Sequence, residues 1–117
     1  MNIQQETSKT TAILSLEGEF TFAARQIFVE AVQRAYATGC RHLVLNLERV
    51  SFVDSAALGV LVVTQNRCNL EHRRFSLVSP QPYVQEIFKL ANLDQLIPIY
   101  ASQAAALEAK EGMSARP

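Results

Sequence analysis

Asp54 and Ser55 stand directly before an apolar run over residues 56–63. These residue types in that order are typical of a helix start, because either side-chain oxygen can accept a hydrogen bond from an unpaired amide of the first turn. A hydroxyl at that end is suited to carry a phosphate, since the free amides and the helix dipole favour negative charge. Ser55 is therefore a candidate phosphorylation site, and the simpler alternative is that Ser55 only caps the helix.

A second alternative is that Ser55 is a catalytic nucleophile paired with one of the two histidines, His42 or His72. The chain has no Gly-x-Ser-x-Gly elbow and no evident oxyanion motif beside either histidine. It also has no glycine-rich phosphate loop, so ATP would be bound by a partner. We therefore expect a protein that is not an enzyme and has no cofactor.

The composition argues against several classes of partner. Eleven basic and eleven acidic residues give a net charge of zero, which does not attract nucleic acid or anionic membranes. The apolar run is much shorter than the ~20 residues that span a bilayer, and no signal-peptide pattern begins the chain. Cys40 and Cys68 lack metal-ligand spacing, so we expect them to be reduced and partly buried, with no bound metal. These features predict a cytoplasmic protein.

The elements before Asp54 follow from local patterns. Residues 2–6 and 11–16 flank a polar segment and predict a β-hairpin, after which residues 19–21 are expected to form a short loop. Residues 22–38 show helical spacing, with Thr21 as the cap and Gly39 as the stop. The side chains expected on the buried face of that helix are Ala24, Ile27, Phe28, Ala31, Val32 and Ala35.

Residues 42–47 form a compact apolar segment, typical of a central strand in a covered sheet. The run at 56–63 has no helical periodicity, but the preceding cap and a polar continuation favour a helix. Such a helix is apolar on every face, so part of its apolar surface is expected to meet another layer or a partner.

The remaining elements are a strand over residues 74–79, then a helix that begins at Ser79 and Pro80. The side chains expected on that helix's buried face are Val84, Ile87, Phe88 and Ala91. A short edge strand over residues 96–100, broken by Pro98, and a last alanine-rich helix over residues 102–110 complete the pattern.

This alternation predicts a single α/β domain over residues 1–110, with a mixed, mostly parallel sheet of about five strands and about four helices. We expect residues 111–117 to be a flexible C-terminal tail.

Residues 46–60, Asn-Leu-Glu-Arg-Val-Ser-Phe-Val-Asp-Ser-Ala-Ala-Leu-Gly-Val, resemble the central signature of bacterial anti-sigma factor antagonists of the STAS family. Gly18-Glu19-Phe20 and the spaced Gly39 are supporting matches, and the resemblance covers almost the whole chain. It implies that Ser55 is phosphorylated by a partner that is both an anti-sigma factor and a serine protein kinase. A metal-dependent serine phosphatase would reverse this, and the unphosphorylated form would bind the anti-sigma factor and release its sigma factor.

The resemblance also implies a partner-binding surface around Ser55. Its expected residues are Glu19, Phe20, Thr21, Asp54, Ser55, Ala56, Ala57, Leu58 and Gly59. Many relatives carry Asp at the position of Thr21 and Gly at the position of Ala57. The Thr21 difference removes a negative charge from the loop, and the Ala57 difference is interpreted as an added methyl at a close-contact surface.

Two further alternatives stay open at this point. Ser51 and Thr64 are competing phosphate acceptors, although Thr64 is expected to bond back along its helix. The protein could instead be a non-switching STAS interaction subunit of a signalling or lipid-transport complex, with Ser55 acting only as a cap.

Overall fold

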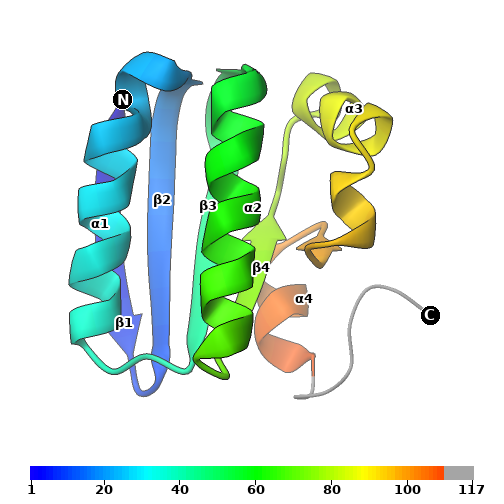
Figure 1. Cartoon of the computed structure of the whole chain (residues 1–117). Helices are drawn as coiled ribbons and strands as arrows, with labels where there is room; N and C mark the ends of the chain where they lie inside the picture. The colour runs from blue at the N-terminus through cyan, green and yellow to red at the C-terminus, as the bar shows by residue number, and fades with distance from the viewer. Residues whose placement is uncertain (110–117) are drawn as a thin grey trace.

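The computed structural model describes residues 1–109, so the predicted tail at 111–117 and the domain end at 110 lie outside the described residues. Within this part of the chain there is one five-stranded sheet, with strand order β1-β2-β3-β4-β5 (Figure 1). The strands are β1 (Asn2–Ser8), β2 (Thr11–Phe20), β3 (His42–Val53), β4 (Arg74–Val78) and β5 (Ile99–Tyr100). β1 pairs antiparallel with β2, and all other pairs are parallel, so the predicted mixed sheet is confirmed.

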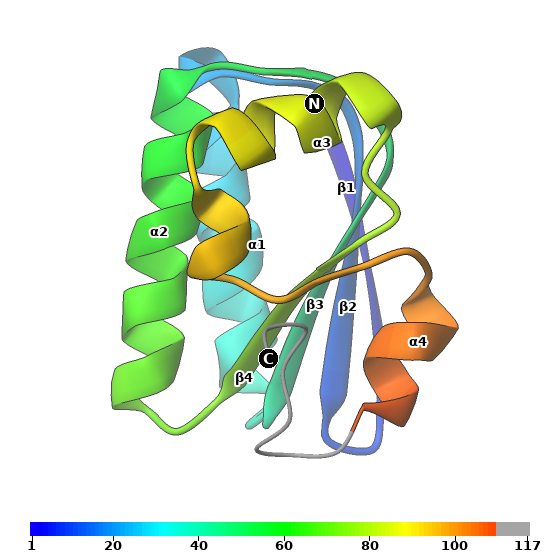
Figure 2. The same ribbon diagram turned by 90° about the vertical axis from the view of Figure 1, so that its right-hand side faces the viewer.

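Four α-helices accompany the sheet within residues 1–109, as predicted. They are α1 (Arg25–Ala37), α2 (Ser55–Leu70), α3 (Pro82–Leu90) and α4 (Gln103–Glu108), with two 3-10 turns, η1 (Phe22–Ala24) and η2 (Leu93–Gln95). α1 and α2 lie on one face of the sheet, and α4 lies on the other (Figure 2). The larger core joins the first face to α1, α2 and α3, and a smaller one joins Ile13, Val44 and Val78 to Ala106 of α4.

Both central strands run further than predicted. The expected loop at 19–21 is wrong for Glu19 and Phe20, which are the last two residues of β2. β3 likewise continues through residues 48–53, beyond the apolar segment predicted as a strand at 42–47. Register shifts at Ser15/Glu17 and Gly18/Glu19 break the alternation of buried and exposed residues, so the period-two signal is lost while backbone pairing persists. As a result, Phe20 and Val53 are paired neighbours just before the Asp54-Ser55 step.

The helix following β4 begins two residues later than predicted. Ser79 has a left-handed backbone with φ 57°, and α3 begins at Pro82 with Gln81 as its N-cap. Pro82 restricts Gln81 to an extended conformation, with ψ 154°, which places the helix boundary there. The predicted edge strand is shorter than expected, because only Ile99 and Tyr100 pair with β4.

The predicted burial is largely confirmed. In the helix predicted to begin after Thr21, the apolar face is buried except for Ile27, which is exposed, and Gly39 follows the helix with φ 76°. In α3, Val84 and Phe88 are buried, whereas Ala91 lies beyond the helix and is exposed. Cys40 and Cys68 are both free and buried. α2 has exposed apolar side chains, including Val63.

Candidate functional site

Asp54, and not Ser55, caps helix α2. Asp54 is the N-cap residue, with an extended backbone, and its Oδ1 accepts a hydrogen bond of 2.9 Å from the amide of Ala57. The Asp54 carbonyl accepts the amide of Leu58 at 3.1 Å, which closes the first turn. The helix start predicted from the Asp-Ser pair is confirmed, and the two residues have different positions in it.

The same carboxylate fastens the turn after β2 to the start of α2. Oδ2 of Asp54 accepts a hydrogen bond of 3.0 Å from the amide of Phe22, which is 32 residues away in the chain. The Asp54 amide in turn donates to the Phe20 carbonyl at 3.2 Å. These amide hydrogen bonds, that from Ala57 foremost, lower the pKa of Asp54 below its ordinary value. Asp54 is therefore an ionised anchor between two segments.

Ser55 is the first residue of α2, and its side chain is exposed. Within residues 1–109 its hydroxyl makes no hydrogen bond, because the Ala57 amide that it could have accepted is bonded to Asp54. The hydroxyl is therefore accessible at the positive end of a 16-residue helix. The alternative that Ser55 is the helix cap is not what the structure shows.

The two competing phosphate acceptors, Thr64 and Ser51, lack the placement of Ser55. Thr64 is buried, and its hydroxyl donates to the Val60 carbonyl at 2.8 Å, the backward bond expected for it. Ser51 is exposed, but it lies within β3 and not at a helix end. Ser55 alone among these three hydroxyls combines exposure with a helix N-terminus.

The other residues expected to bind a partner fall into three groups by burial. Glu19 and Gly59 are exposed like Ser55, whereas Thr21, Asp54, Ala56 and Leu58 are half-buried. Phe20 and Ala57 are buried in the core, and the Phe20 ring packs on Phe28 with centroids 4.9 Å apart. Phe20 and Ala57 were expected at the partner-binding surface, but both side chains are buried, so the interpretation of the Ala57 methyl as a surface contact is wrong.

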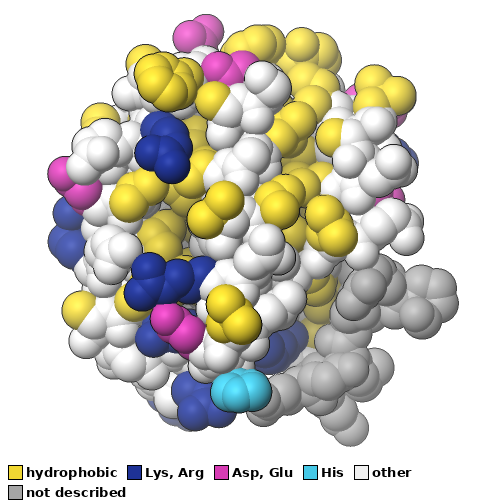
Figure 3. All heavy atoms as spheres, in the orientation of Figure 1, with side chains coloured by type: hydrophobic (Ala, Val, Ile, Leu, Met, Phe, Trp, Pro, Cys, Tyr) yellow, Lys and Arg dark blue, Asp and Glu magenta, His cyan; other side chains and the backbone are white. Residues whose placement is uncertain are grey.

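Three exposed aromatic side chains at this end of the molecule escaped the sequence prediction. They are Phe22 in η1, Phe52 near the end of β3 and Tyr83 in the first turn of α3. Figure 3 shows hydrophobic side chains gathered at this end and along α2. Phe22 and Tyr83 fall outside the apolar faces expected for their helices, which is compatible with exposure but does not by itself predict it, and Phe52 lies outside the predicted elements.

Neither histidine is placed to act as a general base for Ser55. His42 is the first residue of β3, whereas Ser55 follows shortly after the last residue of this 12-residue strand. His72 follows the far end of α2 and is exposed. The imidazole of His42 is buried and shares a 2.8 Å hydrogen bond with the Ser76 hydroxyl. Burial and the nearby Arg74 lower the pKa of His42 to about 4, so its ring is neutral at physiological pH.

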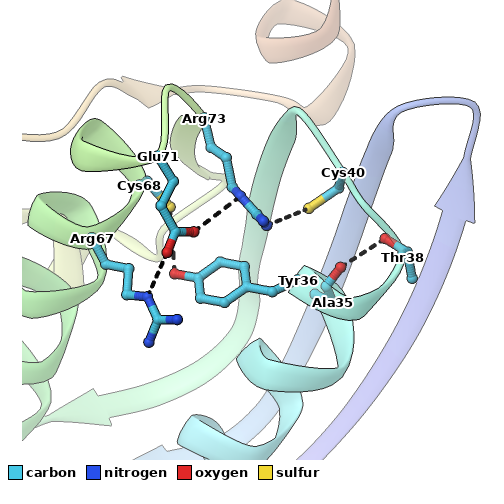
Figure 4. A network of polar contacts seen from close by, with 8 residues as sticks. All are labelled: Ala35, Tyr36, Thr38, Cys40, Arg67, Cys68, Glu71 and Arg73. Carbon is cyan, nitrogen blue, oxygen red and sulfur yellow. Dashed lines mark hydrogen bonds and ion pairs between the residues drawn. The ribbon is translucent and has the colours of Figure 1, made fainter.

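A second cluster of polar groups lies at the opposite end of α2 (Figure 4). The Tyr36 ring lies between the guanidinium groups of Arg67 and Arg73, 5.2 and 4.4 Å from its centroid. Glu71 accepts a hydrogen bond from Arg67 at 2.9 Å and forms an ion pair with Arg73 at 3.4 Å, and the Tyr36 hydroxyl contacts the Cys68 sulfur at 3.6 Å. The charged and hydrogen-bonding groups of this cluster therefore pair with one another.

The surface has an apolar hollow and a polar one. An apolar groove of about 180 Å³ lies between α1 and α2, with Arg25 and Arg67 among its lining residues. A polar hollow of about 280 Å³ lies over β1, β2 and β3. Within residues 1–109 no group of three metal-ligating side chains occurs, and in this same range no helix is long and apolar enough to cross a membrane.

Comparison with known proteins identifies the family of this fold. The family model described as the STAS domain matches residues 2–106. This chain belongs to the STAS domain family. It is 28% identical to the anti-sigma F factor antagonist of Paenibacillus polymyxa, over 97% of this chain and 98% of that protein.

Solved STAS structures have the same architecture. The crystal structure of a candidate anti-sigma factor antagonist from Thermotoga maritima superposes with a TM-score of 0.84 and 27% identity, covering 91% of this chain and 92% of that one. Unphosphorylated SpoIIAA of Bacillus gives a TM-score of 0.78 with 23% identity, over 96% and 98% of the two chains. SpoIIAA is also known in a phosphorylated form, which gives a TM-score of 0.68 at 23% identity, over 92% and 97%.

Proposed function

We propose that this protein is an anti-sigma factor antagonist that works by partner switching. Its unphosphorylated form binds an anti-sigma factor that is also a serine protein kinase, and phosphorylation of Ser55 dissociates the complex. The observation that carries the proposal is the free, exposed hydroxyl of Ser55 at the start of α2, where Asp54 performs the capping. A metal-dependent serine phosphatase returns the protein to its binding form. This activity belongs in the cytoplasm, where sigma factors act.

Electrostatics explains why a phosphate at Ser55 would change binding and leave the fold intact. A phosphate adds about 1.5 to 2 negative charges at neutral pH. Free amides and the helix dipole at the start of α2 stabilise negative charge in the isolated protein. In a complex, the same charges would lie beside the ionised Asp54 and would lose their water. The modified protein therefore remains folded while its affinity for the partner falls.

The relatives support this assignment. The Paenibacillus relative is named an antagonist of an anti-sigma factor and matches over nearly the whole chain. SpoIIAA, which shares the fold, exists in phosphorylated and unphosphorylated forms. The role proposed here for Ser55 needs no catalytic group or cofactor in this chain, because the kinase partner supplies the ATP.

The first test is to purify the protein from its native host under several growth conditions and to map its peptides by mass spectrometry. We expect a phosphate on the peptide that carries Asp54 and Ser55, and none on the same peptide of a Ser55→Ala strain. A peptide that is unmodified under all conditions would contradict switching and favour a fixed STAS interaction subunit.

The second test measures affinity for the kinase by titration calorimetry. Ser55→Ala is expected to bind at least as tightly as the wild type, and Ser55→Asp about 30-fold or more weakly, because an unpaired buried charge costs about 2 kcal/mol or more. Ser55→Asn is the matched control, since Asn has the shape of Asp without its charge. Equal affinities for Ser55→Asn and Ser55→Asp would show that size and not charge weakens binding.

A further inference from the structure

Phe22, Phe52 and Tyr83 place an unusual amount of aromatic surface in water around Ser55. Their exposed fractions are 72% for Phe22, 56% for Tyr83 and 37% for Phe52. Large apolar side chains gathered on one part of a surface are typical of interaction sites, and aromatic residues often dominate binding energy. In this protein they lie at the same end of the molecule as the accessible hydroxyl.

The aromatic side chains come from both sides of α2. Phe22 belongs to η1, between β2 and α1, whereas Tyr83 belongs to α3, and the start of α2 lies between these two elements (Figure 1). Phe52 stacks on Tyr83, with ring centroids 6.4 Å apart and planes at 21°. On the other side, the Phe22 amide is hydrogen-bonded to Asp54, which positions η1 beside the start of α2. Ser55 is therefore flanked by two apolar contacts held by the fold.

Two carboxylates, those of Glu19 and Asp54, accompany these contacts. Glu19 pairs with Phe52 in the register of β2 and β3, and Asp54 precedes Ser55. Within residues 1–109, neither carboxylate takes part in an ion pair, and Glu19 is exposed. A partner that covers this end must therefore present apolar side chains at two separated places, with a Lys or Arg between them.

We propose that Phe22 on one side and the Phe52–Tyr83 pair on the other are the two apolar contacts through which the kinase docks around Ser55. A basic side chain of the kinase would lie against Glu19 and Asp54. This inference rests on the proposed function and specifies which residues give the site its affinity and its choice of partner. A phosphate on Ser55 would then add charge between the two contacts, where it prevents both from being covered together.

The experiment uses the full chain and the host kinase, defined as the purified protein that phosphorylates the wild type at Ser55 with ATP. Affinity is measured by titration calorimetry for Phe22→Ala and Tyr83→Ala. The matched controls are Leu70→Ala at the end of α2 and Leu90→Ala at the end of α3, whose side chains are 82% and 77% exposed. Each control removes a comparable apolar side chain from the same or a neighbouring helix, away from Ser55.

We expect each aromatic variant to bind at least tenfold more weakly, and each leucine control within threefold of the wild type. Tyr83→Phe should restore most of the affinity, because the stacked ring and not the hydroxyl makes the contact. Glu19→Gln should bind slightly more weakly and show less dependence on salt. Thermal unfolding of every variant verifies that the fold is unchanged.

The outcomes separate this inference from the proposed function. If Ser55→Asp weakens binding but the aromatic variants bind like the leucine controls, the docking inference is wrong and the switch remains. If wild type and Ser55→Asp bind equally, the proposed switch is wrong, and the aromatic variants still decide the docking inference. If no kinase binds the wild type, the proposed function and the docking inference both fail.

Discussion

The two ends of α2 both gather polar and aromatic side chains, but they use them in opposite ways. At the C-terminal end, Tyr36 is enclosed by Arg67 and Arg73, and Glu71 is bonded to both arginines (Figure 4). At the N-terminal end, the Ser55 hydroxyl has no partner within residues 1–109, and Phe22 and Tyr83 face solvent. Groups that satisfy one another stabilise a fold, whereas groups left free are available to a partner.

The ionisation of the enclosed cluster supports this distinction. Burial raises the pKa of the Tyr36 hydroxyl well above its ordinary value, and burial also raises the pKa of the Cys68 thiol. Neither group ionises near neutral pH, so the cluster does not offer a thiolate or phenolate for chemistry. The titratable residues of this cluster therefore stabilise the fold and do not form a reactive site.

The largest expected effect is on stability at the C-terminal end. Tyr36→Ala removes a half-buried ring and its contacts with two guanidinium groups, and should lower the free energy of unfolding by about 3 kcal/mol. Chemical denaturation measures this, with Tyr36→Phe as a milder control that loses only the hydroxyl contact with Cys68. Phosphorylation of Ser55 should be unchanged at temperatures where the variant is folded. If Tyr36→Ala left the free energy of unfolding unchanged, the proposed contrast between the two ends of α2 would be wrong.

The same end of the sheet carries a pH dependence through His42. Its pKa is lowered from 6.5 to about 4 in the folded protein, so the unfolded chain binds the proton more readily between these values. The stability contributed by the neutral ring is fully present above pH 6.5 and is lost as the pH falls towards 4. We expect a loss of about 2 kcal/mol between pH 7 and pH 5 from this group. Denaturation at both pH values should show a smaller loss for His42→Gln, and an equal loss would refute the assignment.

Asp54 tests the anchor at the N-terminal end. Asp54→Ala removes the cap of α2 and the hydrogen bond from Phe22, and should lower the Tm by about 4 °C. Asp54→Asn keeps an oxygen that can cap the helix and should retain most of the stability. If both substitutions cost the same, the charge of the carboxylate and not its hydrogen bonding is responsible.

Ser55 should contribute least to stability, in contrast to its effect on binding. Ser55→Ala is expected to change the Tm by less than about 2 °C, because the hydroxyl makes no hydrogen bond within residues 1–109. Ser55→Asp should unfold at the same temperature or slightly higher, since an acidic residue in the first turn is favourable to the helix dipole. A marked drop in Tm for Ser55→Ala would instead indicate that the hydroxyl supports the fold.

Much of the fold follows from local sequence patterns. The hairpin of β1 and β2, the helix that ends shortly before Gly39 and the start of α2 after Asp54 were all predictable. Each depends on side-chain periodicity or on capping groups within a few residues, and such interactions form in the same way whatever the distant parts of the chain do. The role proposed for Ser55 likewise came from its neighbours and from the family resemblance.

Only the tertiary structure decided that the Asp54 carboxylate, and not the Ser55 hydroxyl, caps α2. It also decided which residues surround the Ser55 hydroxyl. Phe20 and Ala57 were expected at the partner surface and are buried, whereas Phe22 and Tyr83 were not singled out and are exposed. These outcomes depend on the extended pairing of β2 with β3 and on a hydrogen bond that joins residues 32 positions apart. Contacts between distant segments leave no local pattern in the sequence, because each partner alone is compatible with burial or exposure.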